Sequence, residues 1–176
     1  MPERAGVWTS LWLTLRSLVS AILLPGFFAA YVPWRYLGLD RVHVDWSSPA
    51  QLAGLVSISA GAALLAACIV EFARSGRGTL SPLDPPRVLV VRGLYKYVRN
   101  PMYVAVTTIV LGEALVARSA ALAAYWAIWF AGANVFVIGY EEPTLRRTFG
   151  ASYDDYARRV DRWIPRLTGV RLVSDT

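Results

Sequence analysis

The sequence has 176 residues, of which 56% are hydrophobic and 17% are charged, and its mean hydropathy is +0.42. Soluble domains usually carry about 25% charged residues, so this composition excludes an ordinary soluble domain and indicates a membrane protein. A single cysteine, Cys68, excludes an intramolecular disulfide, and together with the single histidine, His43, it gives no basis for a metal site. The net charge of +6 does not indicate a nucleic-acid partner, because the basic residues sort by membrane side.

Four apolar stretches approach the roughly 20 residues that a helix needs to cross a bilayer. They predict an all-α, polytopic transmembrane bundle of about four spans, forming a single domain over residues 1–176. The expected spans lie near residues 8–34, 50–72, 101–117 and 120–141. The first contains Arg16 and a central Pro25-Gly26, so we expect it to be kinked.

The later spans carry signals of how they pack. In the second, Gly54, Ser57 and Gly61 follow i, i+3 and i+7, which predicts a face that packs closely against a neighbouring helix. Between the third and fourth, Arg118-Ser119 leaves room only for a tight turn and predicts a helical hairpin. Glu113, near the end of the short third span, could line a cavity or reach the membrane interface.

Orientation follows from the basic residues of the connecting segments, because cytoplasmic loops carry the excess of Lys and Arg. Residues 74–100 hold six and the tail after Tyr140 holds seven, whereas residues 35–49 hold two and the hairpin turn holds one. With four spans, both termini and the long loop are therefore expected in the cytoplasm. Arginine outnumbers lysine 17 to 1, which points to a GC-rich bacterial genome and a bacterial cytoplasmic membrane.

Two polar segments stand next to the predicted cytoplasmic face. The first, VLVVRGLYKYVRNPMY at 88–103, joins an apolar run to aromatic and basic residues and then to a proline that begins a helix. Asn100 before Pro101 suits an N-cap and leaves free backbone N–H groups at a terminus that can hold a carboxylate. We expect this segment to form a cytoplasmic cofactor-binding loop.

The second segment, YEEPTLRRTFGASYDDYARRV at 140–160, puts two acids at the end of the fourth span. Acids at a helix C-terminus oppose the helix dipole, so a role in stability is not expected. Adjacent helical residues point about 100° apart, so at most one of Glu141 and Glu142 can face a given cavity. Asn134, Ile138 and Glu141 share one face by spacing, which indicates an inward-facing polar cavity.

The order of RGLYKYVRNPMY, EEPTLRRTFGASYDDYARRV and a closing RWIPRL resembles the C-terminal signature of the isoprenylcysteine carboxyl methyltransferase family. Phospholipid methyltransferases are similar in the same region. The resemblance covers about residues 87–167 and implies S-adenosylmethionine as cofactor and a membrane lipid, or a lipid-like amphiphile, as methyl acceptor. The cofactor-binding residues that it implies are Leu89, Val90, Tyr95, Asn100, Pro101, Met102, Tyr103 and Glu141, with a helix in the C-terminal segment.

The chemistry agrees with these assignments. A carboxylate such as Glu141 and aromatic faces can stabilise a sulfonium cation, while Arg99 can pair with the cofactor's own carboxylate. Glu141 and Glu142 are the candidate proton acceptors where the methyl acceptor is an amine, which completes a predicted catalytic set of Glu141, Glu142 and Arg99.

Two departures from the family pattern concern the acceptor. The family's usual histidine is Asn100 here, which does not titrate near neutral pH. Eukaryotic members place a substrate-binding arginine where this chain has Val137. Arg146 is the possible substitute, and the predicted substrate positions are Asn134, Val137 and Arg146. We therefore expect weak activity on prenylcysteines.

The sequence leaves O-methylation of a carboxylate and N-methylation of a phospholipid as alternatives. A sterol-reductase-like enzyme that uses NADPH has a similar C-terminal half, but its usual additional spans are missing from this sequence. A non-catalytic membrane adaptor that keeps the fold is the remaining alternative. Binding of S-adenosylmethionine to the purified protein separates the methyltransferases from the other two.

The predicted orientation has a direct test. Reporters fused after Thr176 and within residues 74–100 should both report a cytoplasmic location, because thirteen basic residues lie in these two segments against three in the outer connections. A periplasmic signal from either fusion would contradict the four-span orientation.

Overall fold

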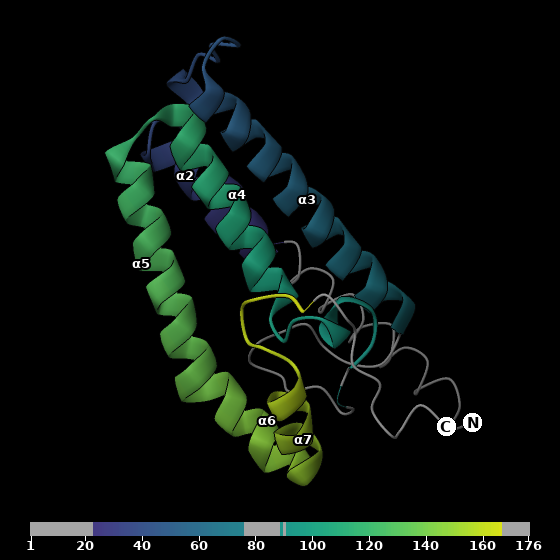
Figure 1. Cartoon of the computed structure of the whole chain (residues 1–176). Coiled ribbons are helices and arrows are strands. Elements are labelled where there is room, and N and C mark those ends of the chain that lie inside the picture. Colours follow the sequence, from purple (N-terminus) through teal and green to yellow (C-terminus); the bar gives the residue numbers. More distant parts are fainter. Residues whose placement is uncertain (1–22, 76–88, 90, 167–176) are drawn as a thin grey trace, which may run out of the picture.

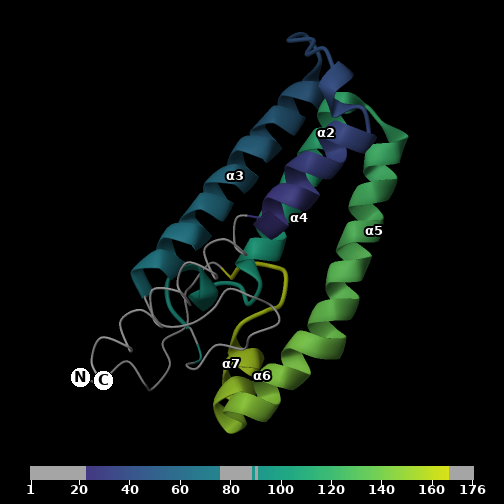
Figure 2. The ribbon, with the colours of Figure 1, turned by 180° about the vertical axis from the view of Figure 1, so that it is seen from behind.

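The computed structural model describes residues 23–75, 89 and 91–166, and every structural statement below concerns these residues. They form helices and turns without a strand, as the all-α prediction expects. In chain order the helices are α2 (Val32–Tyr36), α3 (Pro49–Ser75), α4 (Pro101–Ala117), α5 (Ala120–Phe136), α6 (Glu142–Phe149) and α7 (Ala151–Arg159). Figure 1 shows α3, α4 and α5 running side by side, with α4 in the middle, and Figure 2 shows α2 lying against the far side of α4.

Glycines bring α3 and α4 into close contact, as the spacing of small residues predicts. A Cβ at Gly54 would lie 2.7 Å from the Gly112 carbonyl oxygen, and a Cβ at Gly112 would lie 2.6 Å from that of Gly54. Between the glycine contacts, the Ser57 hydroxyl donates to the Thr108 carbonyl at 2.9 Å. Backbones can approach this closely only where side chains are missing, so the two helices form a rigid pair.

The predicted hairpin between α4 and α5 is confirmed. Arg118 adopts a left-handed conformation (φ 50°) that ends α4, and the Ser119 side chain caps α5 by accepting from the Leu122 N–H. Below this turn, Ala29, Val106, Ile109 and Val110 form a buried apolar cluster. Aromatic side chains of α5 pack against the cluster, so the hairpin and the helix around Ala29 share one core.

The helix that begins with α5 does not end at the glutamate pair, and the end of the membrane span near residue 141 stays a prediction. It continues through a π turn, Val137–Glu141, into α6, and ends where Gly150 takes φ 54°. A π turn widens the helix by one residue and changes which side chains face inward. Val137 is buried, whereas Ile138 is 50% exposed, so the predicted inward stripe is wrong at Ile138.

Two helical segments, Pro49–Glu71 and Ala120–Phe149, are long and apolar enough to cross a membrane, and the apolar helix Pro101–Ala117 is shorter. Large apolar side chains on their outer faces agree with a lipid environment, since Val56, Ile128 and Val135 are 70–73% exposed. The four-span arrangement stays a prediction. Arg16 lies outside the described residues, and directly after Pro25-Gly26, where a kink is expected, the helix forms a π turn, Phe27–Tyr31.

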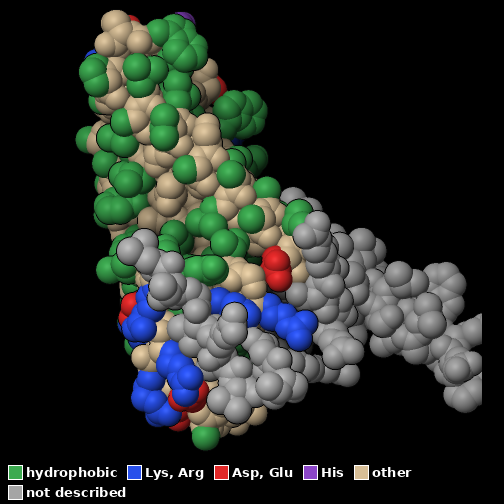
Figure 3. Space-filling model, turned by 45° about the vertical axis from the view of Figure 1, so that its right-hand side comes forward, with side chains coloured by type: hydrophobic (Ala, Val, Ile, Leu, Met, Phe, Trp, Pro, Cys, Tyr) green, Lys and Arg blue, Asp and Glu red, His purple; other side chains and the backbone are tan. Residues whose placement is uncertain are grey.

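Charge is concentrated at one end of the molecule. Figure 3 shows an apolar shaft above and blue basic side chains gathered below it. The described parts of the two basic segments meet at this end, where the Arg99 N–H donates to the Asp161 carbonyl at 2.9 Å. At the opposite end, Arg118 contacts Ser48 and the Gln51 amide contacts the Val116 carbonyl. The described parts of the loop and the tail thus lie at the same end of the bundle, and their side of the membrane stays a prediction.

The contact between α3 and α4 predicts a clear cost for any side chain at Gly112. Gly112→Val should lower the free energy of unfolding by about 1–3 kcal/mol, because the added atoms would overlap the Gly54 carbonyl and Ile58. Thermal unfolding in detergent measures the effect. Gly132→Ala on α5 is the control, since a Cβ there meets nothing within 4 Å. Equal melting temperatures for the two variants would contradict the packing described.

Candidate functional site

The end of the long helix meets the start of α4 through a pair of predicted site residues. The Tyr103 hydroxyl donates to Glu141 Oε2 at 3.2 Å. The Tyr103 ring contacts two tryptophans, Trp129 on α5 and Trp163 after α7, each with ring centroids 6.2 Å apart. A half-buried carboxylate thus lies beside an aromatic cluster at the end of the bundle where the basic side chains gather.

Tyr95 joins this cluster from the turn Gly93–Lys96. Its carbonyl accepts a hydrogen bond from the Tyr156 hydroxyl at 2.8 Å. Burial holds the pKa of the Tyr95 phenol above its usual range, and the neighbouring Cys68 and Glu141 add to the shift, so the phenol stays neutral. The structure therefore brings together Tyr95, Tyr103 and Glu141, three of the residues that the resemblance implies for cofactor binding.

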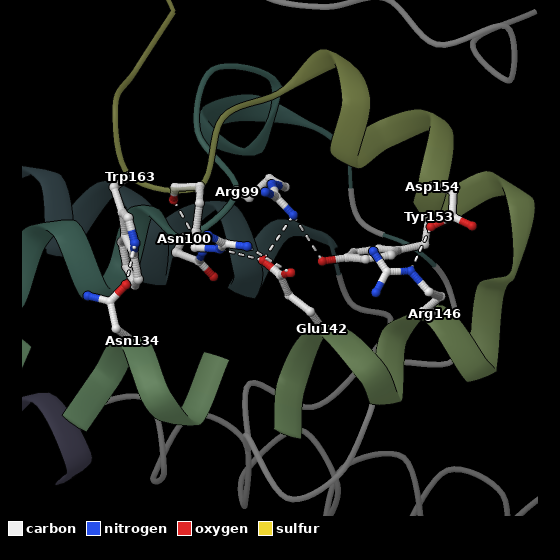
Figure 4. A network of polar contacts seen from close by, with 9 residues as sticks. Arg99, Asn100, Asn134, Glu142, Arg146, Tyr153, Asp154 and Trp163 are labelled. Carbon is white, nitrogen blue, oxygen red and sulfur yellow. Dashed lines mark hydrogen bonds and ion pairs between the residues drawn. The ribbon is translucent and has the colours of Figure 1, made fainter. Parts of the chain in front are cut away.

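Glu142 faces a different set of partners from its neighbour, as the 100° separation requires. Arg99 Nη1 donates to Oε1 at 3.0 Å, and Arg162 donates from Nε to Oε1 at 2.6 Å and from Nη2 to Oε2 at 3.0 Å. Figure 4 shows Arg99 and Tyr153 pointing toward this carboxylate. The hydrogen bond to Glu142 raises the pKa of the Arg162 guanidinium. Glu142 is buried and fully engaged, so its position corresponds to an anchor more than to a proton acceptor.

The start of α4 is held from the tail. Asn100 is the N-cap residue, but its side chain makes no capping bond and its Nδ2 donates to the Arg162 carbonyl at 3.2 Å. Pro101 is fully buried at the first helical position, and Met102 is half-buried beside it. The N–H groups of this terminus are therefore not used by the Asn100 side chain, as the sequence analysis expects.

The predicted substrate residues separate in the structure. Asn134 Oδ1 accepts from Trp163 Nε1 at 2.9 Å, so it faces the aromatic cluster as its spacing from Glu141 predicts. Val137 is only 1% exposed and is packed in the interior. Arg146 lies outside the cluster, where its Nε pairs with Asp154 at 2.7 Å and both side chains are about half exposed. The substrate roles of Asn134, Val137 and Arg146 stay predictions.

The apolar run before the loop is placed only in part. Leu89 packs with Val91 against the buried cluster of Tyr153, Tyr156 and Val160 from the end of α7. Leu89 is only partly buried there, and its role in cofactor binding stays a prediction. Val90 lies outside the described residues.

Some residues of the site were not assigned from the sequence. Arg162 and Trp163 lie in the RWIPRL segment, whose place in the motif was their only sequence signal. Glu71 at the end of α3 lies against Gly93, where φ is 52° and a Cβ would come within 2.6 Å of its carboxyl carbon. Glu113, left open above, is 5% exposed, and its Oε2 has no partner among the described residues.

The donor set fits a cofactor that carries both a cation and a carboxylate. Glu141 and the aromatic rings suit a positive charge. Arg99 Nε is buried without a hydrogen-bond partner in the described part of the chain, and a buried guanidinium N–H left unpaired is costly unless a ligand accepts from it. A positive charge near Glu141 and a carboxylate near Arg99 are together the features of an amino acid with a sulfonium side chain.

Comparison with known proteins decides the family. The family model described as phospholipid methyltransferase matches residues 50–152, which include α3, α4, α5 and both polar motifs up to α7. The chain belongs to this family. Phospholipid methyltransferase membership confirms the resemblance stated from the motifs and supports a membrane methyltransferase.

A relative with a different printed role covers part of the chain. The nickel-cobalt-cadmium resistance protein NccN of Alcaligenes xylosoxydans xylosoxydans is 39% identical over 80 residues, which make up 46% of this chain. The match spans only 37% of the length of NccN. No solved structure matches the chain.

Proposed function

We propose that this protein is an S-adenosylmethionine-dependent membrane methyltransferase whose acceptor is the amine of a lipid-like molecule. The observation that carries the proposal is the acidic and aromatic cluster of Glu141, Tyr103 and Trp163 at the end of the bundle. Family membership supports the methyl transfer, and the charge of the cluster supports the cofactor and the acceptor class.

The cofactor would be held by side chains of both motifs. When bound, it supplies a methyl group on a sulfonium, activated for displacement. Glu141 and the neighbouring aromatic faces would stabilise the sulfonium, and Arg99 Nε would donate to the carboxylate of the cofactor. Tyr95, kept neutral by burial, would add a polar wall without adding charge.

The acceptor class follows from the sign of charge in the site. A carboxylate acceptor would have to approach Glu141, and like charges repel strongly where water is scarce. The basic residues that could offset this repulsion are engaged: Arg162 pairs with Glu142, Arg146 pairs with Asp154, and Arg99 pairs with Glu142 and is assigned here to the carboxylate of the cofactor. An amine has the opposite preference, because its positive charge after methylation stays beside the carboxylate.

The transfer itself is an in-line displacement in which positioning supplies most of the rate enhancement. When bound, the cofactor would supply its methyl group to the lone pair of a neutral amine nitrogen and leave as a neutral thioether, while Glu141 and the aromatic rings would hold the two in line. The positive charge moves to the methylated nitrogen, which then loses a proton to Glu141 or to water. Glu141 therefore faces a cation before and after the step.

Cofactor-binding experiments also test the two alternatives from the sequence, the sterol-reductase-like enzyme and the non-catalytic adaptor. A sterol-reductase-like enzyme would bind NADPH, and an adaptor would bind neither cofactor. We further propose that the site opens to the cytoplasm of a bacterial cell, where S-adenosylmethionine is made, while the acceptor enters from the bilayer.

Glu141→Gln should weaken the binding of S-adenosylmethionine about 10- to 150-fold, which corresponds to about 1.5–3 kcal/mol for a hydrogen-bonded charge. Calorimetry on the purified protein in detergent measures it. Tyr103→Phe, which keeps the ring and removes only the hydroxyl, is the matched control and should cost about tenfold or less. Wild-type affinity in folded Glu141→Gln would remove Glu141 from the site.

The acceptor class is tested by transfer of labelled methyl from S-adenosylmethionine to a panel of phosphatidylethanolamine, farnesylcysteine and geranylgeranylcysteine. We expect label on the lipid amine and little on the prenylcysteine carboxylates, because Glu141 repels an anion. Efficient turnover of the prenylcysteines instead would show that the enzyme is a carboxyl O-methyltransferase.

A further inference from the structure

We propose that Arg162 is a positioning residue for the cofactor site, which it builds by fastening the segment after α7 to both methyltransferase motifs at once. The inference rests on the proposed function, because the site in question is the cofactor site. Arg162 is not among the predicted catalytic residues, and it also lies outside residues 50–152 that match the family model.

The segment 160–166 returns from α7 to the start of α4, and Figure 1 shows it as a yellow loop that leads back toward α4. Its backbone is tied to the first motif at three points. The Arg99 N–H donates to the Asp161 carbonyl, the Asn100 amide donates to the Arg162 carbonyl, and the Arg166 N–H donates to the Tyr97 carbonyl. The turn before α4 therefore takes its position from this segment.

The side chain of Arg162 makes the link to the second motif. Its Nε and Nη2 donate in parallel to the two oxygens of Glu142, at 2.6 Å and 3.0 Å. The Glu142 side chain is 10% exposed and that of Arg162 is 30% exposed, so the pair is largely shielded from water. Only a guanidinium offers two parallel donors to one carboxylate, and a lysine cannot reproduce that geometry.

The neighbour of Arg162 carries the effect to the proposed sulfonium pocket. Trp163 packs edge-on against Tyr103 with an interplanar angle of 87°, and its ring nitrogen donates to Asn134. Tyr103 in turn donates to Glu141. With Arg162 fixed on Glu142, the indole is fixed on Tyr103, and Tyr103 is fixed on the carboxylate that would face the cation.

A purely structural role and a positioning role make different predictions. The closely packed α3–α4 pair and the apolar cluster around Val110 lie away from this segment, so the bundle has its own sources of stability. Loss of the Arg162 fork should instead separate Arg99 and Asn100 from Glu141. The Michaelis constant for the cofactor should then rise, while that for the acceptor stays nearly unchanged.

The test uses the full chain in detergent, with Arg162→Gln, Arg162→Lys and Arg159→Gln. Arg159 pairs with the partly exposed Asp155 on α7 and serves as the control. We expect S-adenosylmethionine to bind Arg162→Gln at least tenfold more weakly than wild type, Arg162→Lys to recover part of the loss, and Arg159→Gln to match wild type. The Michaelis constant for phosphatidylethanolamine should change less than twofold in all three.

The outcomes separate this inference from the proposed function. Failure of the wild-type protein to bind S-adenosylmethionine would overturn the proposed function and this inference with it. Wild-type binding together with unchanged affinity in folded Arg162→Gln would overturn the positioning role alone. Should Arg162→Gln not fold, Arg162→Lys decides, since reduced cofactor affinity in that charge-conserving variant supports the role and unchanged affinity refutes it.

Discussion

One carboxylate, that of Glu142, receives hydrogen bonds from two arginines that come from opposite sides of the site. Arg99 belongs to the turn before α4, and Arg162 belongs to the segment after α7. A buried carboxylate is costly unless it is paired and hydrogen-bonded, and a buried guanidinium has the same requirement. Each group therefore needs the other two, and this mutual requirement fixes three segments that are far apart in the sequence. The aromatic cluster and Glu141 take their places around that fixed point.

The remainder of the bundle supplies a frame that does not depend on charge. The glycine contacts hold α3 and α4 at backbone distance, and the tight turn at Arg118 holds α5 alongside them. Such contacts are set by shape, and they leave α4 little freedom to slide or rotate. The start of α4 therefore keeps a fixed position relative to the segment after α7 that binds it. The bundle is thus held together by apolar helix packing, and its polar end is held together by ion pairs. The proposed cofactor site lies where these two regions meet.

The adjacent residues Glu141 and Glu142 have different partners because successive side chains of a helix point in different directions. Both oxygens of Glu142 accept hydrogen bonds from arginines, whereas Glu141 accepts a hydrogen bond from Tyr103 and lies beside aromatic rings. A site of this kind attracts cations. This asymmetry links the family chemistry to the proposed choice of an amine over a carboxylate acceptor, since only an amine is positively charged directly after the methyl transfer.

Local patterns in the sequence determined the helical class, the packing face of Gly54, Ser57 and Gly61, the turn at Arg118-Ser119 and the family itself. These features depend on neighbours along the chain, so spacing and residue type are enough to predict them. The tertiary structure alone decided which glutamate is an anchor, because the partners of Glu142 lie 20 and 43 residues away and a sequence does not reveal which of many arginines will meet a given acid. It also showed that Val137 is buried, that Ile138 in the π turn is half exposed, and that Arg146 pairs with Asp154. A π turn adds one residue to a helical turn in response to packing on both sides, and periodicity by itself cannot predict it.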